Sequence, residues 1–115
     1  MLQVVFYKTQ SGNEVVRDYL RQLPANDKRK VGEDLMTVQI GYPMGLPLCR
    51  PLGDGLTEVR TSLPSKREIR MIFAFDSGSR CLVVLHAFIK KARQIPKSDL
   101  DLAKSRKAEF IMKGG

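Results

Sequence analysis

The stretch LTEVRTSLPSKREIRMIFAFDSGSRCLVVLHAFI, residues 56–89, decides the fold. It contains three runs, at residues 56–63, 67–75 and 81–89, in which side chains sort with a period of two, as is typical of β-strands. The segments between the runs, PSK and DSGS, are rich in turn residues and too short to join anything but antiparallel neighbours. The stretch therefore predicts three consecutive antiparallel strands.

A strand and two helices are predicted before this stretch. Residues 2–7, LQVVFY, have the composition of a strand. In the following SGNE, Ser11 and Glu14 have the spacing of a capping box, which predicts a helix that ends at Pro24. Apolar residues at helical spacing predict a second helix over about residues 26–39.

The remaining segments are a loop and a closing helix. Residues 41–55 contain three prolines and four glycines, which predicts a loop. Residues 97–112 have a helical pattern, with Ser98 and Asp101 at capping spacing. The predicted order is strand, helix, helix, three strands, helix. We therefore expect one domain over residues 1–115, a small α+β fold with a largely antiparallel sheet.

The composition is that of a globular protein, with 43% apolar and 28% charged residues. The apolar runs are too short to span a membrane and the N-terminus does not resemble a secretion signal, so we expect a cytoplasmic protein without membrane contact. Cys49, Cys81 and the single histidine are too few for a zinc site. We therefore expect buried free thiols, with no metal and no cofactor.

The net charge of +8 is concentrated near the C-terminus. Residues 87–115 carry eight Lys and Arg against three Asp and Glu. Such a field attracts phosphate backbones or acidic protein surfaces, and nucleic acid is the leading candidate. Charge alone leaves both kinds of partner open.

Several cations share one predicted sheet face. In the strand at residues 81–89, the row of Cys81 and its alternate neighbours to Ile89 is entirely apolar and is expected to pack on the core. The same alternation places a second set of side chains on the opposite, solvent-facing side: Arg60, Arg70, His86, Phe88 and Lys90. A solvated face with cross-strand ion pairs to Glu58 and Glu68 is the alternative interpretation.

The order and spacing of ten residues resemble the RelE/ParE toxin superfamily, most closely its HigB-like branch. These residues are Gly55, Leu56, Glu58, Arg60, Arg70, Phe88, Lys90, Lys91, Pro96 and Ala103. The resemblance covers essentially the whole chain. It implies a type II toxin that cleaves mRNA on the ribosome, neutralised by a cognate antitoxin of the helix-turn-helix type, with operator DNA contacted only through that antitoxin.

The resemblance implies roles for individual residues in cleavage by the RNA 2′-hydroxyl, without a metal. Arg60 and Arg70 match the strand arginines of the family and would stabilise the transition state, since guanidinium groups bind phosphate oxygens in pairs. His86 would transfer a proton, because its ordinary pKa lies near neutrality, and a lysine is the alternative acid. A structural role for His86, packed within its strand, is the other interpretation. The RNA and the ribosome would be bound by Phe88, Lys90, Lys91 and Arg93.

The sequence departs from the family at Thr57 and Ile69, where aromatic residues are usual, and at Arg93, where a small hydroxyl residue is common. Base stacking would then fall to Phe88, to Tyr42 or to a ribosomal base. The rival interpretation is a non-catalytic or ParE-like protein that binds gyrase, or only its antitoxin.

Overall fold

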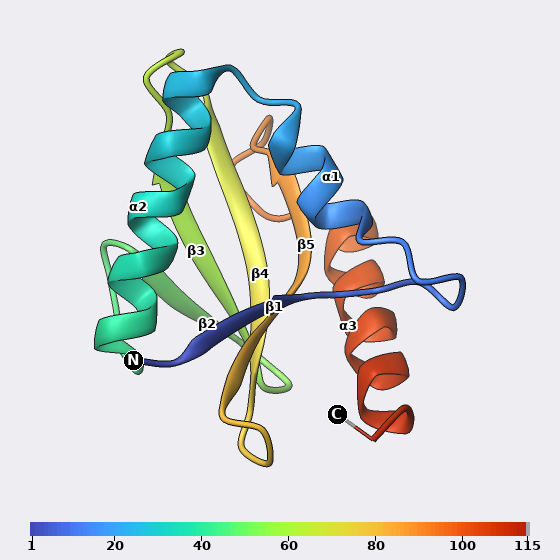
Figure 1. Ribbon diagram of the computed structural model, residues 1–115. Helices are drawn as coiled ribbons and strands as arrows, with labels where there is room; N and C mark the ends of the chain where they lie inside the picture. The colour runs from blue at the N-terminus through green and yellow to red at the C-terminus, as the bar shows by residue number, and fades with distance from the viewer. Residues whose placement is uncertain (115) are drawn as a thin grey trace.

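The computed structural model describes residues 1–114, which form a five-stranded sheet and three helices (Figure 1). The α+β class and the largely antiparallel sheet are confirmed. In chain order the elements are β1 (Gln3–Phe6), α1 (Val15–Arg21), α2 (Ala25–Gly41), β2 (Cys49–Gly53), β3 (Leu56–Ser62), β4 (Glu68–Asp76), β5 (Cys81–Ile89) and α3 (Lys97–Met112).

The predicted order of elements was wrong in one respect, because it lacked β2. This strand lies within residues 41–55, where prolines and glycines predicted a loop. β2 is one of the two edge strands and pairs with β3 alone within the described chain. An edge strand tolerates Pro51, because the missing N–H can face away from the ladder.

The strand order is β1-β5-β4-β3-β2, with β1 parallel to β5 and all other neighbours antiparallel. Helices cover both faces of this sheet: α1 and α2 lie on one side and α3 on the other (Figure 1). Successive β4 residues show the division, since Met71 belongs to the apolar cluster under α1 and α2, and Ile72 to the cluster under α3. The face predicted to be solvated is therefore largely covered.

A β-bulge in β5 overturns the predicted alternation of this strand. His86 pairs with Ile72, but Val84 pairs with the next β4 residue, Phe73, so Leu85 is the extra residue. Leu85 packs in the cluster under α3, whereas Ala87 packs in the cluster under α1 and α2. The apolar row predicted from Cys81 to Ile89 is thus split between the two faces.

The helices begin differently from the sequence prediction. Glu14 and Pro96 are the N-cap residues of α1 and α3, and neither cap makes a side-chain hydrogen bond. The capping boxes predicted at Ser11 and Ser98 are therefore wrong. Within residues 1–114, no helix has the length and hydrophobicity needed to cross a membrane.

Both cysteines are free and buried, as the sequence predicted. Cys49 begins β2 and is fully buried, and Cys81 begins β5. Burial raises the pKa of the Cys49 thiol above its ordinary value. Cys49 therefore packs as a small apolar residue, and its thiol is poorly suited to act as a nucleophile.

Candidate functional site

A cleft of about 550 Å³ opens at the end of the sheet where β3, β4 and β5 meet the segment that leads into α3. β2 and β3 supply one part of its wall, and residues 89–96 supply another part. The full lining is Tyr19, Arg50, Glu58, Arg60, Arg67, Arg70, Phe88, Ile89, Lys90, Lys91, Ala92, Arg93, Gln94, Ile95, Pro96 and Asp99.

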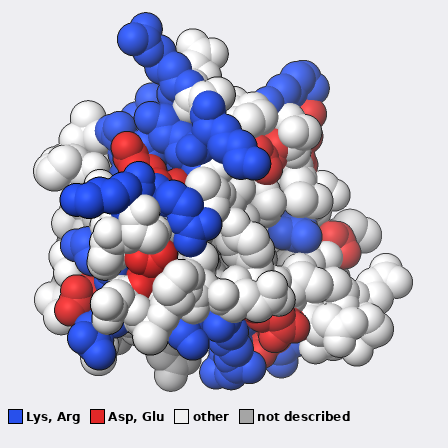
Figure 2. Space-filling model, turned by 90° about the horizontal axis from the view of Figure 1, so that it is seen from above, with Lys and Arg blue, Asp and Glu red and all other residues white. Residues whose placement is uncertain are grey.

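Basic side chains dominate this end of the molecule. Figure 2 looks down on the end where α2 begins and the β3–β4 hairpin lies, and it shows Lys and Arg side chains over much of this face, with smaller acidic patches among them. A second groove of about 410 Å³ lies beside the cleft and adds Lys66 to the basic residues. The positive surface therefore extends beyond the cleft towards the hairpin.

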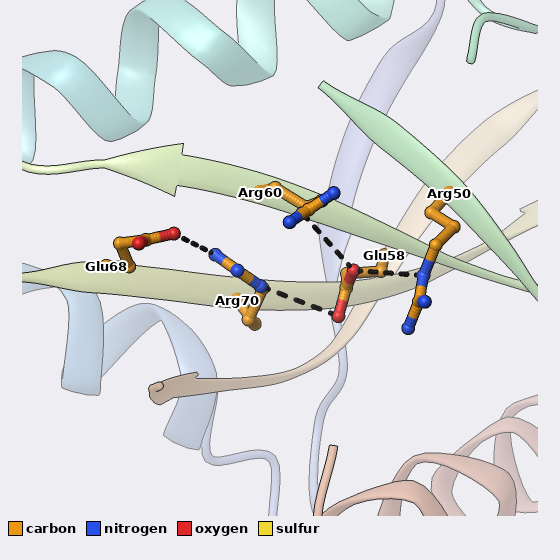
Figure 3. A network of polar contacts seen from close by, with 5 residues as sticks. All are labelled: Arg50, Glu58, Arg60, Glu68 and Arg70. Atoms are coloured by element: carbon orange, nitrogen blue, oxygen red, sulfur yellow. Dashed lines mark hydrogen bonds and ion pairs between the residues drawn. The ribbon is translucent and has the colours of Figure 1, made fainter. Parts of the chain in front are cut away.

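Three arginines surround one buried carboxylate in the cleft, and we refer to Arg50, Arg60, Arg70 and Glu58 as the arginine cluster (Figure 3). Glu58 Oε1 lies 3.5 Å from Arg50 Nε and 3.8 Å from Arg60 Nε, and Glu58 Oε2 lies 3.6 Å from Arg70 Nε. The sheet register explains the gathering, since Arg50 pairs with Glu58 and Arg60 pairs with Arg70. Like charges directly opposite repel, and the carboxylate offsets that repulsion.

The members of the arginine cluster differ in exposure. The Arg70 side chain is only 3% exposed, against 37% for Arg60 and 50% for Arg50. Arg70 Nη1 also donates a hydrogen bond of 2.9 Å to Glu68 Oε1, and this bond holds the pKa of the Glu68 carboxyl below its ordinary value. Arg70 is on the predicted face, but the expectation that it is solvated is wrong: it lies beneath the more exposed arginines.

The basic residues that follow β5 form a second part of the cleft wall. Lys90, Lys91 and Arg93 all line it, and they also line the neighbouring groove. The backbone N–H of Lys90 donates to the Glu68 carbonyl at 2.7 Å, so the β4–β5 ladder continues to the cleft edge. These cations therefore project from a segment whose start is fixed by the sheet.

His86 faces α3. Its Nε2 lies 2.6 Å from Asp99 Oδ1, in the first turn of α3, and its ring stacks on Phe88 with 5.4 Å between centroids. The lining of the cleft, taken over residues 1–114, includes Asp99 and Phe88 but not His86. The carboxylate of this pair is thus the group that faces the cleft.

The structure separates the aromatic residues proposed for base stacking. Phe88 lines the cleft beside the arginine cluster and pairs with Arg70 across the strands. Tyr42 instead packs against Phe73 and Phe75, in the apolar cluster under α1 and α2. Tyr42 is therefore not placed to stack on a base in the cleft.

Sequence reasoning missed several residues of the site, among them Tyr19, Arg50 and Asp99. The sequence predicts a loop over residues 41–55, so the alternation of side chains along a strand could not be used to place Arg50 on a sheet face. Tyr19 falls on the apolar stripe of α1, and its pattern indicates a core residue. Of these residues, only Asp99 could have been noticed in the sequence, because an acidic residue in the first turn of a predicted helix is favourable. Groups of three potential metal ligands are absent from residues 1–114.

Comparison with known proteins gives one family. The family model described as "Phage derived protein Gp49-like (DUF891)" matches residues 18–108, which include the whole cleft lining. This is a RelE-type family of toxin-like proteins. A search of curated proteins finds no match to the chain.

Proposed function

Because the chain belongs to the Gp49-like family, we propose that it is a type II toxin that cleaves mRNA on the ribosome and is neutralised by a cognate antitoxin. One observation carries the proposal: one cleft is lined by two half-exposed arginines, Arg50 and Arg60, and by three further cations after β5. A cleft lined by so many cations suits the phosphodiester backbone of a nucleic acid.

In the proposed reaction, the RNA 2′-oxygen attacks the adjacent phosphorus and the bond from phosphorus to the 5′-oxygen breaks. The products are a 2′,3′-cyclic phosphate and a 5′-hydroxyl. Arg50 and Arg60 bind the phosphate oxygens on which charge develops, and fixed cations at that point lower the barrier. Arg70, being buried, supports this surface from below.

Two proton transfers accompany that exchange of bonds. The 2′-hydroxyl proton passes to the Asp99–His86 pair, whose carboxylate faces the cleft and whose imidazole lies behind it. The leaving 5′-oxygen receives a proton from a lysine of the segment after β5, such as Lys90. Lys91 and Arg93 hold the backbone on either side of the reacting phosphate.

A non-catalytic function is the second candidate, and one observation favours it. Two acid–base groups of the site are already paired, since His86 Nε2 contacts Asp99 and both Glu58 oxygens face guanidinium groups. A cleft of this kind can bind an acidic segment of an antitoxin, or of gyrase, without any chemistry.

Cleavage-site mapping on translated mRNA separates the two functions. The wild type should cut mRNA only when ribosomes are present, and Arg60→Ala should lower single-turnover cleavage by about a hundredfold. Arg17→Ala is the matched control, because Arg17 is similarly exposed at 46% but pairs with Glu14 outside the cleft. His86→Gln should lower cleavage by about a hundredfold with ribosome binding retained.

The mapping has one outcome that favours the rival. Growth arrest by the wild type, reversed by the product of a neighbouring antitoxin frame and accompanied by intact mRNA, would exclude ribonuclease activity. Co-purification of the arrested cells' gyrase with the toxin would then support the ParE-like alternative.

A further inference from the structure

We infer that Glu58 is a positioning residue, which orients the guanidinium groups of Arg50 and Arg60 so that their terminal nitrogens face the cleft. The inference rests on the proposed function, because it assigns the carboxylate a role in the phosphate-binding half of that site. It concerns a residue that does not itself touch the substrate.

The contacts of Glu58 all involve the same guanidinium atom. In each ion pair the nitrogen closest to the carboxylate is Nε, at 3.5 Å for Arg50, 3.8 Å for Arg60 and 3.6 Å for Arg70 (Figure 3). Within residues 1–114, the Nε contacts of Arg50 and Arg60 are ion pairs without a hydrogen bond and their Nη atoms make no hydrogen bond, whereas Arg70 Nη1 donates to Glu68. The carboxylate therefore holds the inner part of the two exposed groups and leaves their outer donors free.

The position of Glu58 makes it a rigid anchor. Its side chain is 3% exposed and lies on β3, with β2 on one side and β4 on the other. Arg50 and Arg60 have long, half-exposed side chains that would otherwise sample many rotamers. A fixed carboxylate beneath both restricts them to orientations that suit a bound phosphate, which is the requirement for a preorganised site.

Two simpler roles fit the geometry less well. As a general base, Glu58 would need a free oxygen directed at the 2′-hydroxyl, but both of its oxygens face guanidinium groups. As a source of binding energy, a buried negative charge within the cluster is unfavourable, because it opposes attraction of phosphate. Orientation and affinity are therefore separable, since loss of the Glu58 charge affects them in opposite directions.

The decisive variant is Glu58→Gln, which removes the charge and keeps the shape. Affinity for a 2′-O-methyl RNA, measured by fluorescence anisotropy, should stay equal or tighten. Single-turnover cleavage on saturated ribosomes should fall about a hundredfold, the loss typical of a misplacement of about 1 Å. Glu14→Gln, which removes a carboxylate paired with Arg17 outside the cleft, should leave both quantities unchanged.

A second variant guards against loss of folding. Glu58→Asp keeps the charge but withdraws the carboxylate by one methylene, so positioning predicts retained RNA affinity and reduced cleavage. Full cleavage by either variant would overturn the inference. Parallel loss of affinity and cleavage in a folded variant would also overturn it, because Glu58 would then act on binding.

Nuclear magnetic resonance of the Arg Nε–H groups tests the inference without any reaction. The Nε–H signals of Arg50 and Arg60 should exchange slowly in the wild type and faster in Glu58→Gln. If the wild type cleaves no RNA but these signals change as expected, the proposed function fails and the positioning role stands. Unchanged signals in the folded variant would refute the positioning role, whether or not RNA is cleaved.

Discussion

Substitution of Arg70 by alanine should destabilise the protein strongly, although the residue belongs to the site. Arg70 is 3% exposed and pairs with the equally buried Glu58. Loss of one partner of a buried ion pair costs about 3–5 kcal/mol, because the other charge is left without compensation. Arg50 and Arg60 still face Glu58 in the variant, so we expect about 3 kcal/mol, the lower end of that range.

The contact of Arg70 with Glu68 adds little to this figure. The Glu68 side chain is 48% exposed, and exposed ion pairs contribute about 0–1 kcal/mol. For a chain of this size, 1 kcal/mol corresponds to a shift in Tm of about 4 °C, so Arg70→Ala should lower Tm by about 12 °C.

Thermal unfolding followed by far-ultraviolet circular dichroism measures this loss. Arg60→Ala is the matched control: it removes a guanidinium from the same carboxylate, but from a side chain that is 37% exposed, so it should cost about 1 kcal/mol or less. Equal losses in the two variants, or a loss below about 1 kcal/mol for Arg70→Ala, would refute the burial argument. Activity of Arg70→Ala must accordingly be measured below its own Tm.

Three further predictions concern other contacts. Hydrogen bonding by Ser65 holds the pKa of Asp27 below its ordinary value, so this stabilisation is complete above about pH 4 and is lost as the pH falls through the lowered pKa. Asp27→Asn should therefore have a lower Tm than the wild type near neutral pH and converge with it in acid; a constant difference would contradict the linkage. A double-mutant cycle with His86→Gln and Asp99→Asn should give a coupling free energy of about 1–2 kcal/mol in unfolding experiments. Additive losses of stability in the two single variants would show that the 2.6 Å contact does not stabilise the fold. Neutralisation of about four phosphates of single-stranded RNA should give a slope near −3 in a plot of log affinity against log salt, and Lys91→Ala should make it shallower by about 0.7; a slope unaffected by that change would place Lys91 outside the interface.

The sequence predicted the centre of the sheet because alternation and short turns depend only on neighbouring residues. The bulge in β5 depends on the rest of the fold. The Leu85 carbonyl at the bulge accepts a hydrogen bond of 2.9 Å from Arg106 Nη1, and Arg106 lies on α3, far along the chain. A contact from another element does not alter the alternation of residue types in the strand sequence. The sheet face of each residue after Leu85 therefore could not be predicted.

The candidate site was predictable to the same extent. Arg60, Arg70 and Phe88 were expected on one face, and the register places them in one cross-strand row. The burial of Arg70 was not predictable, because it depends on Glu58 and on the proximity of α3 to this face. Arg50 was missed for a different reason. Pro51 lies in the same strand, and because proline disfavours strands, the sequence pattern predicts a loop there.

Two parts of the cleft wall differ in net charge, and this difference implies different tasks. The three arginines of the arginine cluster are paired with Glu58 and Glu68, so these five residues together retain a net charge of only about +1. The segment after β5 carries Lys90, Lys91 and Arg93, for which no ion pair is found within residues 1–114, so under the proposed function the field that attracts RNA originates there. Ion pairs within the arginine cluster fix the orientation of its side chains but reduce the net positive charge that can attract a ligand. Fixed donors are what stabilisation of a reacting phosphate requires. Under the proposed function, the arginine cluster would orient the phosphate and the segment after β5 would recruit the RNA.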